Sequence, residues 1–349
     1  MKATDAPVVR PWAVLGNERV QEFLQTSVAS DRCASAYLFT GPRSVGKGTV
    51  ALHFLQAVLC HTPVRGVACG QCVSCVAWKR GTHPDAVLFN PDTFATEDDE
   101  KKSVTGAIVI DRVREILQKL HYRPALGTYR VALLHHADRL MVQAANALLK
   151  TLEEPLPNTV IVLTAVSRGS LPLTVRSRCQ ELAFHSVDDT VIAQKLESLI
   201  DDAETMRNIV ACAAGRPGVA LTYAQNPQAL SAYREQVEKI LAIIEAPMPQ
   251  RLTLTSALIR PQRGERATWQ TLQELLGRWR GIVLDMVLLG KRAEGYLVNR
   301  FAVERLRTLV DRYGAQHCAE SLLRLEMARR RIRYNVNPQL VFDDLILHW

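Results

Sequence analysis

A glycine-rich segment at residues 41–49, with the sequence GPRSVGKGT, has the residue types that bind a phosphate chain. Gly41 and Gly46 allow backbone N–H groups to converge on phosphate oxygens, and the ammonium group of Lys47 can reach the terminal phosphates. A short apolar run precedes the segment and a helical pattern follows it, which is the context that a P-loop requires. The segment therefore predicts a nucleotide-binding loop between a strand and a helix.

The position after the lysine departs from a P-loop that supports hydrolysis. Such a loop has Ser or Thr there to bind Mg²⁺, whereas this chain has Gly48. Thr49 carries a hydroxyl group, but one step along a helix turns its side chain away by about 100 degrees. We therefore expect a degenerate site at Gly41, Gly46, Lys47 and Thr49 that binds ATP or ADP without hydrolysing it. A vestigial loop that stays empty is the alternative.

Four cysteines follow within a short segment, at Cys60, Cys69, Cys72 and Cys75. Thiolates at this spacing can close a tetrahedral structural zinc site, with no position left for a substrate. A cytosolic chain disfavours disulfides here. An iron–sulfur cluster is also disfavoured, because Lys79 stands where the fourth cysteine of that spacing would lie. We therefore predict a structural zinc ion at these four cysteines.

The middle of the chain predicts half of a parallel α/β sheet. Val131–Leu134 and Val160–Thr164 are short β-branched apolar runs, typical of strands that are covered on both faces. Between them, apolar residues recur at helical spacing until Pro155 ends the pattern. ATPases of this fold have two acidic residues after the first of these strands, one for magnesium and one for the attacking water. This chain has His135 and His136 there, so the hydrolytic carboxylates are missing.

The two histidines are not expected to bind one metal ion. Consecutive residues of a strand point to opposite faces of the sheet, so His135 and His136 cannot both face the same ion. Asp138 is expected to cap the helix that follows it. We interpret all three residues as structural.

The segment Ala145–Pro155, ANALLKTLEEP, and the triplet Ser177–Cys179 resemble a signature of the AAA+ clamp-loader family. The resemblance implies that Arg178 is an arginine finger, which reaches into the nucleotide site of the neighbouring subunit in a ring. Arginine suits that role because its planar charge matches the phosphoryl transition state. Ala165 and Val166 stand where ATPases of the family have a polar sensor residue. An ion pair of Arg178 at the surface of its own chain is the alternative.

The resemblance covers essentially the whole chain and implies three domains. Residues 1–183 are expected to form an α/β AAA+ P-loop domain with a parallel sheet, into which a zinc module at residues 60–75 is inserted. Residues 184–227 are expected to form a helical lid domain. Residues 228–349 have apolar stripes at helical spacing and are expected to form an all-α collar domain for oligomerisation. A helical bundle without partners is the alternative for this last domain.

The composition is that of a soluble globular protein, with 48% hydrophobic residues and a formal net charge of +8. No apolar run reaches the roughly 18 residues that span a membrane, and the polar start MKATDAPVVRPW lacks the apolar core of a signal peptide. We therefore expect a cytoplasmic protein. The basic excess suits a nucleic acid or an acidic protein partner. Solvated helix faces rich in arginine explain it equally well, because clustered aromatic residues are missing.

The resemblance and the missing acids together predict a clamp-loader subunit that does not hydrolyse ATP and lends Arg178 to an adjacent ATP site. The implied partners within DNA polymerase III are the ATPase subunits gamma or tau and the delta subunit. Through the assembled complex, the sliding clamp and primed DNA would be further partners in DNA replication, and no membrane is implied. A divergent gamma or tau ATPase subunit with a working P-loop is the first alternative. A separate nucleic-acid-binding protein that uses its basic collar is the second.

Overall fold

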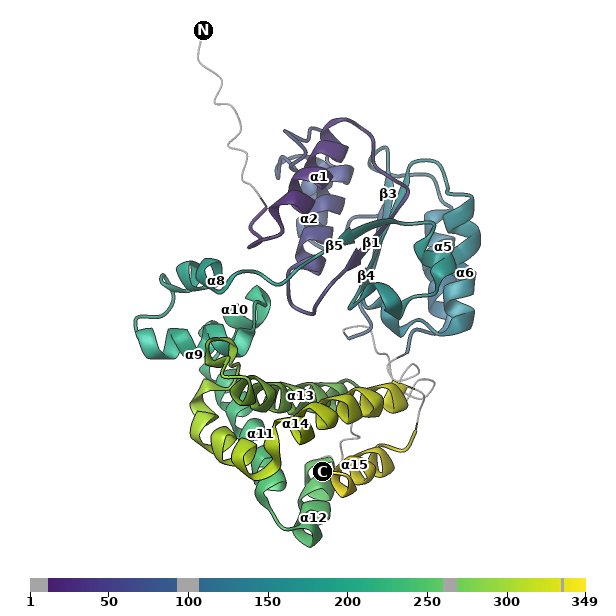
Figure 1. The fold of residues 1–349 in the computed structure, drawn as a ribbon. Helices are drawn as coiled ribbons and strands as arrows, with labels where there is room; N and C mark the ends of the chain where they lie inside the picture. The colour runs from purple at the N-terminus through teal and green to yellow at the C-terminus, as the bar shows by residue number, and fades with distance from the viewer. Residues whose placement is uncertain (1–11, 93–106, 260–268, 334–335) are drawn as a thin grey trace. The chain divides into compact units, whose positions relative to one another are not determined.

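The structure is a computed structural model, and it describes residues 12–92, 107–259, 269–333 and 336–349. The chain forms two compact units, which are coloured along the sequence in Figure 1. The first unit consists of residues 1–188 with 216–218, and the second of residues 189–215 with 219–349. The finer division into a lid domain and a collar domain stays a prediction.

The described part of the first unit contains one five-stranded sheet with the order β2-β3-β4-β1-β5. The strands are β1 (Ala36–Thr40), β2 (Ala86–Phe89), β3 (Arg130–Leu134), β4 (Thr159–Ala165) and β5 (Gln180–Ala183). All neighbouring strands pair in parallel. The three central strands, β3, β4 and β1, are buried along their whole length, as expected for strands covered on both faces. The predicted parallel α/β fold is confirmed.

Helices cover both faces of this sheet, α1 and α2 on one face and α5 and α6 on the other (Figure 1). Their bounds are Glu18–Ala29, Lys47–Leu59, Ile110–Leu120 and Val142–Glu153 in that order. Strand alternation sends side chains of β1 to both layers. Tyr37 and Phe39 join the core beneath α1 and α2, whereas Leu38 joins the core beneath α5 and α6. The sheet is therefore buried between two apolar layers.

The topology brings the predicted site residues to one edge of the sheet. The glycine-rich loop follows β1, His135 follows β3, and Val166 follows β4. These three strands are adjacent and parallel, so their carboxyl ends lie at the same edge, where ligands of open α/β sheets bind. The sheet therefore positions the loop and the residues after β3 and β4 next to one another.

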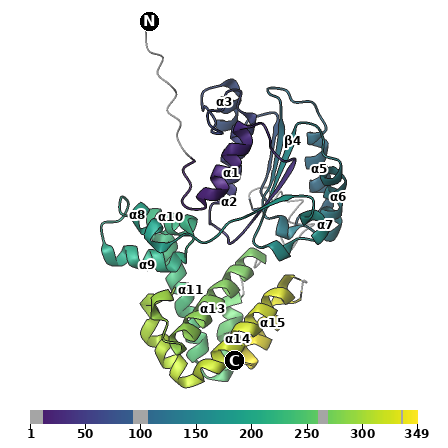
Figure 2. The same ribbon diagram turned by 45° about the horizontal axis from the view of Figure 1, so that its top comes forward.

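The cysteine segment runs between α2 and the short helix α3 (Val73–Lys79), which Figure 2 shows at the periphery of the first unit. The hydroxyl group of Ser74 donates to the carbonyl oxygen of Leu59 at 2.6 Å and lies 2.9 Å from Nε2 of His83. Nδ1 of His83 accepts the backbone N–H of Asp85, so Nε2 is the protonated nitrogen and donates to Ser74. These buried bonds join the cysteine segment to the end of α2 and the start of β2.

The described part of the second unit is helical. Its α-helices are α8 (Asp189–Leu196), α9 (Ala203–Ala213), α10 (Pro217–Gln225), α11 (Pro227–Glu245), α12 (Met248–Ile259), α13 (Trp269–Gly290), α14 (Val303–Arg333) and α15 (Pro338–Leu347). Trp279 of α13 and Phe342 of α15 are fully buried and their rings pack against each other. The helical C-terminal region is thus confirmed. Within the described ranges, none of the helices combines the length and the apolar character needed to span a membrane.

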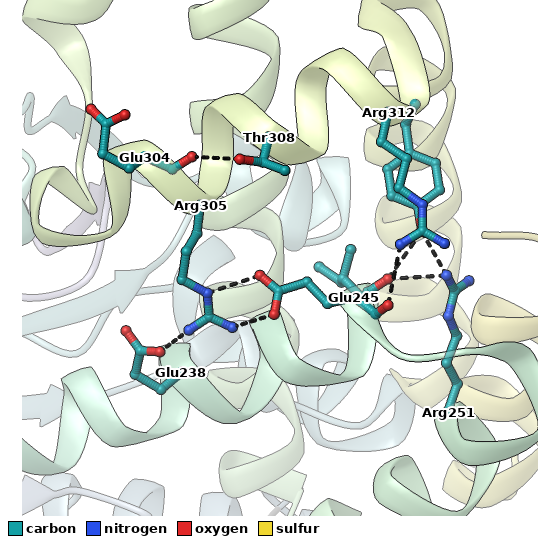
Figure 3. Close-up of polar contacts among 9 residues, drawn as sticks. Glu238, Glu245, Arg251, Glu304, Arg305, Thr308 and Arg312 are labelled. Atoms are coloured by element: carbon teal, nitrogen blue, oxygen red, sulfur yellow. Dashed lines mark hydrogen bonds and ion pairs between the residues drawn. The ribbon is translucent and has the colours of Figure 1, made fainter.

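Arginine side chains join the end of α11 to α12 and α14 (Figure 3). Arg305 of α14 donates from Nε and Nη2 to the two carboxylate oxygens of Glu245, at 2.8 and 2.6 Å. Arg251 of α12 is only 5% exposed, and it donates to the carbonyl oxygens of Ala246 at 2.7 Å and Ile244 at 3.0 Å. The last carbonyl groups of a helix have no partner within it. Arg251 satisfies that of Ala246 and shares that of Ile244 with the hydroxyl group of Tyr313, which donates to it at 3.0 Å.

Candidate functional site

The glycine-rich loop has a backbone conformation that requires glycine at both ends. Gly41 has a φ of 145°, and a Cβ atom added there would lie 2.3 Å from the carbonyl oxygen of Phe184. Gly46 has a φ of 98°, and its Cβ would lie 2.7 Å from a methyl carbon of Val14. Gly46 immediately precedes α2, so the loop leads into a helix N-terminus as the sequence predicts. Gly41 and Gly46 therefore both have backbone conformations, and close neighbours, that favour glycine.

The side chain of Lys47 is turned onto its own loop. It is 8% exposed, and Nζ donates to the carbonyl oxygens of Gly41 at 2.7 Å and Pro42 at 2.5 Å. Burial lowers the pKa of Lys47 to about 8, while the carboxylate of Asp138 raises it and Arg43 lowers it further. The ammonium group must leave these two carbonyl oxygens before it can bind a phosphate.

The ring of His135 lies against Gly48. A Cβ atom added at Gly48 would lie 2.7 Å from Cε1 of this ring and 3.5 Å from Nδ1. Burial lowers the pKa of His135 to about 4, with the charges of His136 and Lys47 acting in the same direction, so the ring is neutral at neutral pH. The imidazole thus fills the space that a Ser or Thr side chain at position 48 would need.

The neighbouring histidine has a different partner. Nε2 of His136 lies 3.3 Å from a carboxylate oxygen of Asp92, and this bond lowers the pKa of Asp92. His136 has a φ of 54°, because β3 ends at Leu134 and the chain turns sharply after His135. The two histidine rings therefore face separate groups, His135 the P-loop and His136 an aspartate.

The prediction that Asp138 caps the following helix is wrong. Asp138 lies in a single 3₁₀ turn, Ala137–Arg139, and α6 begins after Met141, whose side chain makes no capping bond. Asp138 instead accepts the backbone N–H of Val166 at 3.2 Å. The inserted turn moves the helix start beyond the reach of Asp138, whose carboxylate joins the turn after β3 to the end of β4.

Two further residues of the segment 41–49, Thr49 and Ser44, have defined surroundings. Thr49, the last predicted nucleotide-binding residue, is exposed in the first turn of α2, one position beyond Gly48. Ser44 has a φ of 60°, and its carbonyl oxygen accepts the backbone N–H of Gly218 at 2.9 Å. The segment 216–218 therefore belongs to the first unit through a bond to the loop itself.

The four predicted cysteines come together in one cluster. Their Sγ atoms all lie within 4.8 Å of one another, with 4.0 Å between Cys60 and Cys72 and between Cys69 and Cys75. Four sulfurs around a tetrahedral zinc ion, each about 2.3 Å from it, would be about 3.8 Å apart. Backbone N–H groups donate to three of the sulfurs: Cys69 to Cys60, Cys72 to Cys69, and Cys75 to Cys72. The donor set and its spacing fit a metal ion, and no other such group exists among the described residues.

One thiol of this cluster is poised to ionise. Burial would raise the pKa of Cys69, but hydrogen bonds with the backbone N–H groups of Gln71 and Cys72 and with the side chains of Thr62 and Cys60 together outweigh it and lower the pKa to about 6. A thiolate is the form that binds metals, so the local backbone prepares this ligand for metal binding.

Arg178 lies in the turn after the short helix α7 (Leu173–Arg176), and its side chain is 33% exposed. Nη2 lies 2.7 Å from a carboxylate oxygen of Glu153, the last residue of α6, and Nη1 donates to the carbonyl oxygen of Thr174 at 2.8 Å. The ion pair within the chain, which was the alternative to a finger, is thus present. It does not bury the guanidinium group.

Two contacts of this site were missed from the sequence. Gly48 and His135 were recognised as separate departures from a working ATPase, but nothing in the sequence indicated that they touch. Glu153 belongs to the family-like segment, yet its pairing with Arg178 has no local signal. Both contacts join residues that are far apart along the chain and become neighbours through the parallel sheet and its crossover helices.

A family model described as DNA polymerase III, delta subunit, matches residues 16–188 of the chain. The tau subunit of DNA polymerase III from Bacillus subtilis (strain 168) is 27% identical over 96% of this chain and 60% of its own length. A delta' subunit from Pseudomonas aeruginosa is 35% identical, but the chain spans only 54% of it, with 53% of this chain aligned. The delta' subunit of Bacillus subtilis (strain 168) is 27% identical over 94% of both chains. The chain therefore belongs to the family of DNA polymerase III clamp-loader subunits, with a similarity to delta' subunits that extends over more than nine-tenths of its length.

Proposed function

We propose that this chain is a clamp-loader subunit of the delta' type that does not hydrolyse ATP. The observation that carries the proposal is the contact of His135 with Gly48. Hydrolysis requires a hydroxyl ligand for magnesium after the P-loop lysine and carboxylates after β3. Here a neutral imidazole and a glycine stand at those positions, and the nearby carboxylate of Asp138 is bonded to the backbone of Val166. ATP or ADP binding without hydrolysis remains part of the proposal, with Gly41, Gly46, Lys47 and Thr49 as the loop residues.

The second part of the proposal is that Arg178 acts in trans, as an arginine finger at the ATP site of a neighbouring subunit. Its place in an exposed turn supports this role, because a finger must leave its own chain to reach a phosphate. The fork of guanidinium nitrogens binds phosphate oxygens in pairs and disperses the charge of the transition state. The chain would therefore supply one catalytic group to a site that it does not itself contain.

The proposed partners are the gamma or tau ATPase subunits and the delta subunit of DNA polymerase III. Through the assembled ring, the sliding clamp and primed DNA would be the targets. Residues 184–227 would form the lid and residues 228–349 the collar that holds ring contacts. Cys60, Cys69, Cys72 and Cys75 would hold a structural zinc ion, whose closed tetrahedral shell leaves no position for a reaction.

The proposal is tested on a clamp loader assembled from this chain and its partner subunits. Replacing Arg178 by Ala should leave the mass of the complex unchanged and lower its DNA-stimulated ATP hydrolysis. Lys47→Ala should leave the rate unchanged, because the P-loop of this chain does not contribute turnover. Arg168→Ala is the matched control, since Arg168 is a more exposed arginine on the turn before α7. An unchanged rate with Arg178→Ala removes the finger role.

A divergent gamma or tau ATPase subunit is the second candidate. It is favoured by the 27% identity to a tau subunit over 96% of this chain. This candidate requires ATP turnover by the purified chain alone, and loss of that turnover when Lys47 is replaced by Ala. Turnover that shows this dependence would overturn the assignment as a non-hydrolysing subunit.

A further inference from the structure

The guanidinium group of Arg178 is held by acceptors of its own chain. Nη2 pairs with the carboxylate of Glu153 at 2.7 Å, and Nη1 bonds to the carbonyl oxygen of Thr174 at 2.8 Å and lies 3.3 Å from the hydroxyl oxygen of Ser177. Thr174 precedes Arg178 by four residues, so the side chain folds back along α7. Glu153 is the last residue of α6, Thr174 lies in α7, and Ser177 directly follows α7. The three contacts therefore hold the guanidinium group against its own chain.

These contacts use the nitrogens that a finger needs. An arginine binds a phosphate or a carboxylate best through two parallel N–H···O bonds, commonly with both Nη atoms. In this chain both Nη atoms are already engaged, Nη2 in an ion pair with a carboxylate and Nη1 in a hydrogen bond to a carbonyl oxygen. A triphosphate of a neighbouring subunit must therefore displace Glu153, or Thr174, before Arg178 can bind it in the same way.

We propose that Glu153 is a positioning residue, which keeps Arg178 folded onto its own chain until the terminal phosphates of a neighbouring nucleotide replace the carboxylate. The inference rests on the proposed role of Arg178 in trans. Glu153 is the charged group that the triphosphate would replace. The triphosphate competes successfully for the guanidinium group because it carries several negative charges and Glu153 carries one. Both side chains are partly exposed, 33% for Arg178 and 49% for Glu153, so water and phosphate have access to the pair.

The exposure of both side chains also limits how strongly the ion pair holds Arg178 against its own chain. Ion pairs between exposed side chains contribute about 0.2–1 kcal/mol, which corresponds to a factor of about 1.5 to 5. The pair is therefore strong enough to bias the position of Arg178 and weak enough to be displaced at each turnover. A Glu153→Gln variant removes the charge, keeps the shape of the side chain, and should release the guanidinium by that factor.

The neighbouring carboxylate provides a matched control. Glu154 follows Glu153 directly, is exposed, and makes no ion pair with any described residue. Glu154→Gln therefore removes the same charge from the same turn without touching Arg178. Any effect of charge on ring assembly or on DNA binding would be shared by the two variants, whereas an effect on Arg178 would belong to Glu153→Gln alone.

The first test measures DNA-stimulated ATP hydrolysis of the assembled clamp loader. With Glu153→Gln, kcat/KM should rise about 1.5- to fivefold relative to Glu154→Gln, and the rise should vanish when Arg178→Ala is present in the same chain. A rise is diagnostic, because a residue that only stabilises the fold would lower the rate or leave it unchanged. Equal kcat/KM for the two glutamine variants, or a fall with Glu153→Gln, would overturn the inference.

The second test uses the isolated chain and needs no partner. The Nε–Hε signal of Arg178 in ¹⁵N NMR should show greater side-chain mobility in Glu153→Gln and wild-type mobility in Glu154→Gln. An Arg178 signal that is equally rigid in both would also overturn the inference. Failure of the proposed function is recognised separately, since Arg178→Ala alone would then leave the ATPase of the complex unchanged.

Discussion

The imidazole ring of His135 packs against the α-carbon of Gly48, so closely that a Cβ atom there would approach ring Cε1 to 2.7 Å. In a P-loop ATPase these two positions carry a hydroxyl ligand of magnesium and an acidic residue. The glycine makes room for the ring, and the ring fills the room that the glycine leaves. Restoring a side chain at one position therefore requires a change at the other.

A double-mutant cycle tests this contact. Gly48→Thr should lower the free energy of unfolding by about 1–3 kcal/mol, because the new side chain overlaps the His135 ring. In a His135→Ala background the same change should cost little, or stabilise the helix, since Thr is a better helix residue than Gly. Urea unfolding of the four proteins gives the coupling energy. Costs that simply add would show that the two residues do not compete for space.

The protonation of His135 makes the stability of the folded chain depend on pH. Its pKa is lowered to about 4 from the ordinary value of 6.5 by burial, and by the charges of His136 and Lys47 against the opposing charge of Asp92. The unfolded chain therefore binds a proton more readily than the folded chain, and stability is lost as the pH falls from about 6.5 through 4. His135→Asn should reduce this loss. Melting temperatures of the two proteins should converge, or cross in favour of the variant, at pH 4.5, and a constant difference from pH 7.5 to 4.5 would contradict the shift.

The cysteine cluster predicts one zinc ion per chain. Cys72→Ser should reduce the zinc content measured by elemental mass spectrometry and lower the melting temperature, because a structural zinc ion contributes directly to folding. Cys33→Ser is the control, since Cys33 lies outside the cluster. The control variant should keep its zinc. A wild-type chain that contains no metal and is unaffected by a strong chelator would contradict the zinc site.

The arginines at the end of α11 make unequal contributions to stability. Arg251→Met would leave the carbonyl oxygen of Ala246 without this donor and that of Ile244 with the hydroxyl group of Tyr313 alone, at a cost of about 1–3 kcal/mol. Arg312→Met is the comparison, because Arg312 is exposed and its bond to the carbonyl oxygen of Glu245 measures 3.2 Å. It should cost less than about 0.5 kcal/mol. Chemical denaturation followed by circular dichroism measures both, and equal costs would refute the difference in role.

Features that depend on neighbouring residues were predicted well. The apolar runs Val131–Leu134 and Val160–Thr164 lie within the strands β3 and β4, which extend them by at most one residue at each end. The cysteines lie within one short segment, and their cluster follows from that spacing. The cap expected at Asp138 failed for a related reason. A single 3₁₀ turn separates this residue from α6, and no residue type in the segment distinguishes that turn from the first turn of the helix.

The sequence by itself determined the α/β sheet, the glycine-rich loop, the thiol cluster and the missing acids, because each of these depends on residue type and on spacing along a short segment. Only the tertiary structure decided that His135 fills the space beside Gly48, that Lys47 bonds to its own loop, and that Glu153 pairs with Arg178. The first and last of these contacts join residues of different helices and turns. The distances between these residues depend on the register of the parallel strands and on the packing of helices across them. A pattern of neighbouring residues in the sequence does not determine either of these.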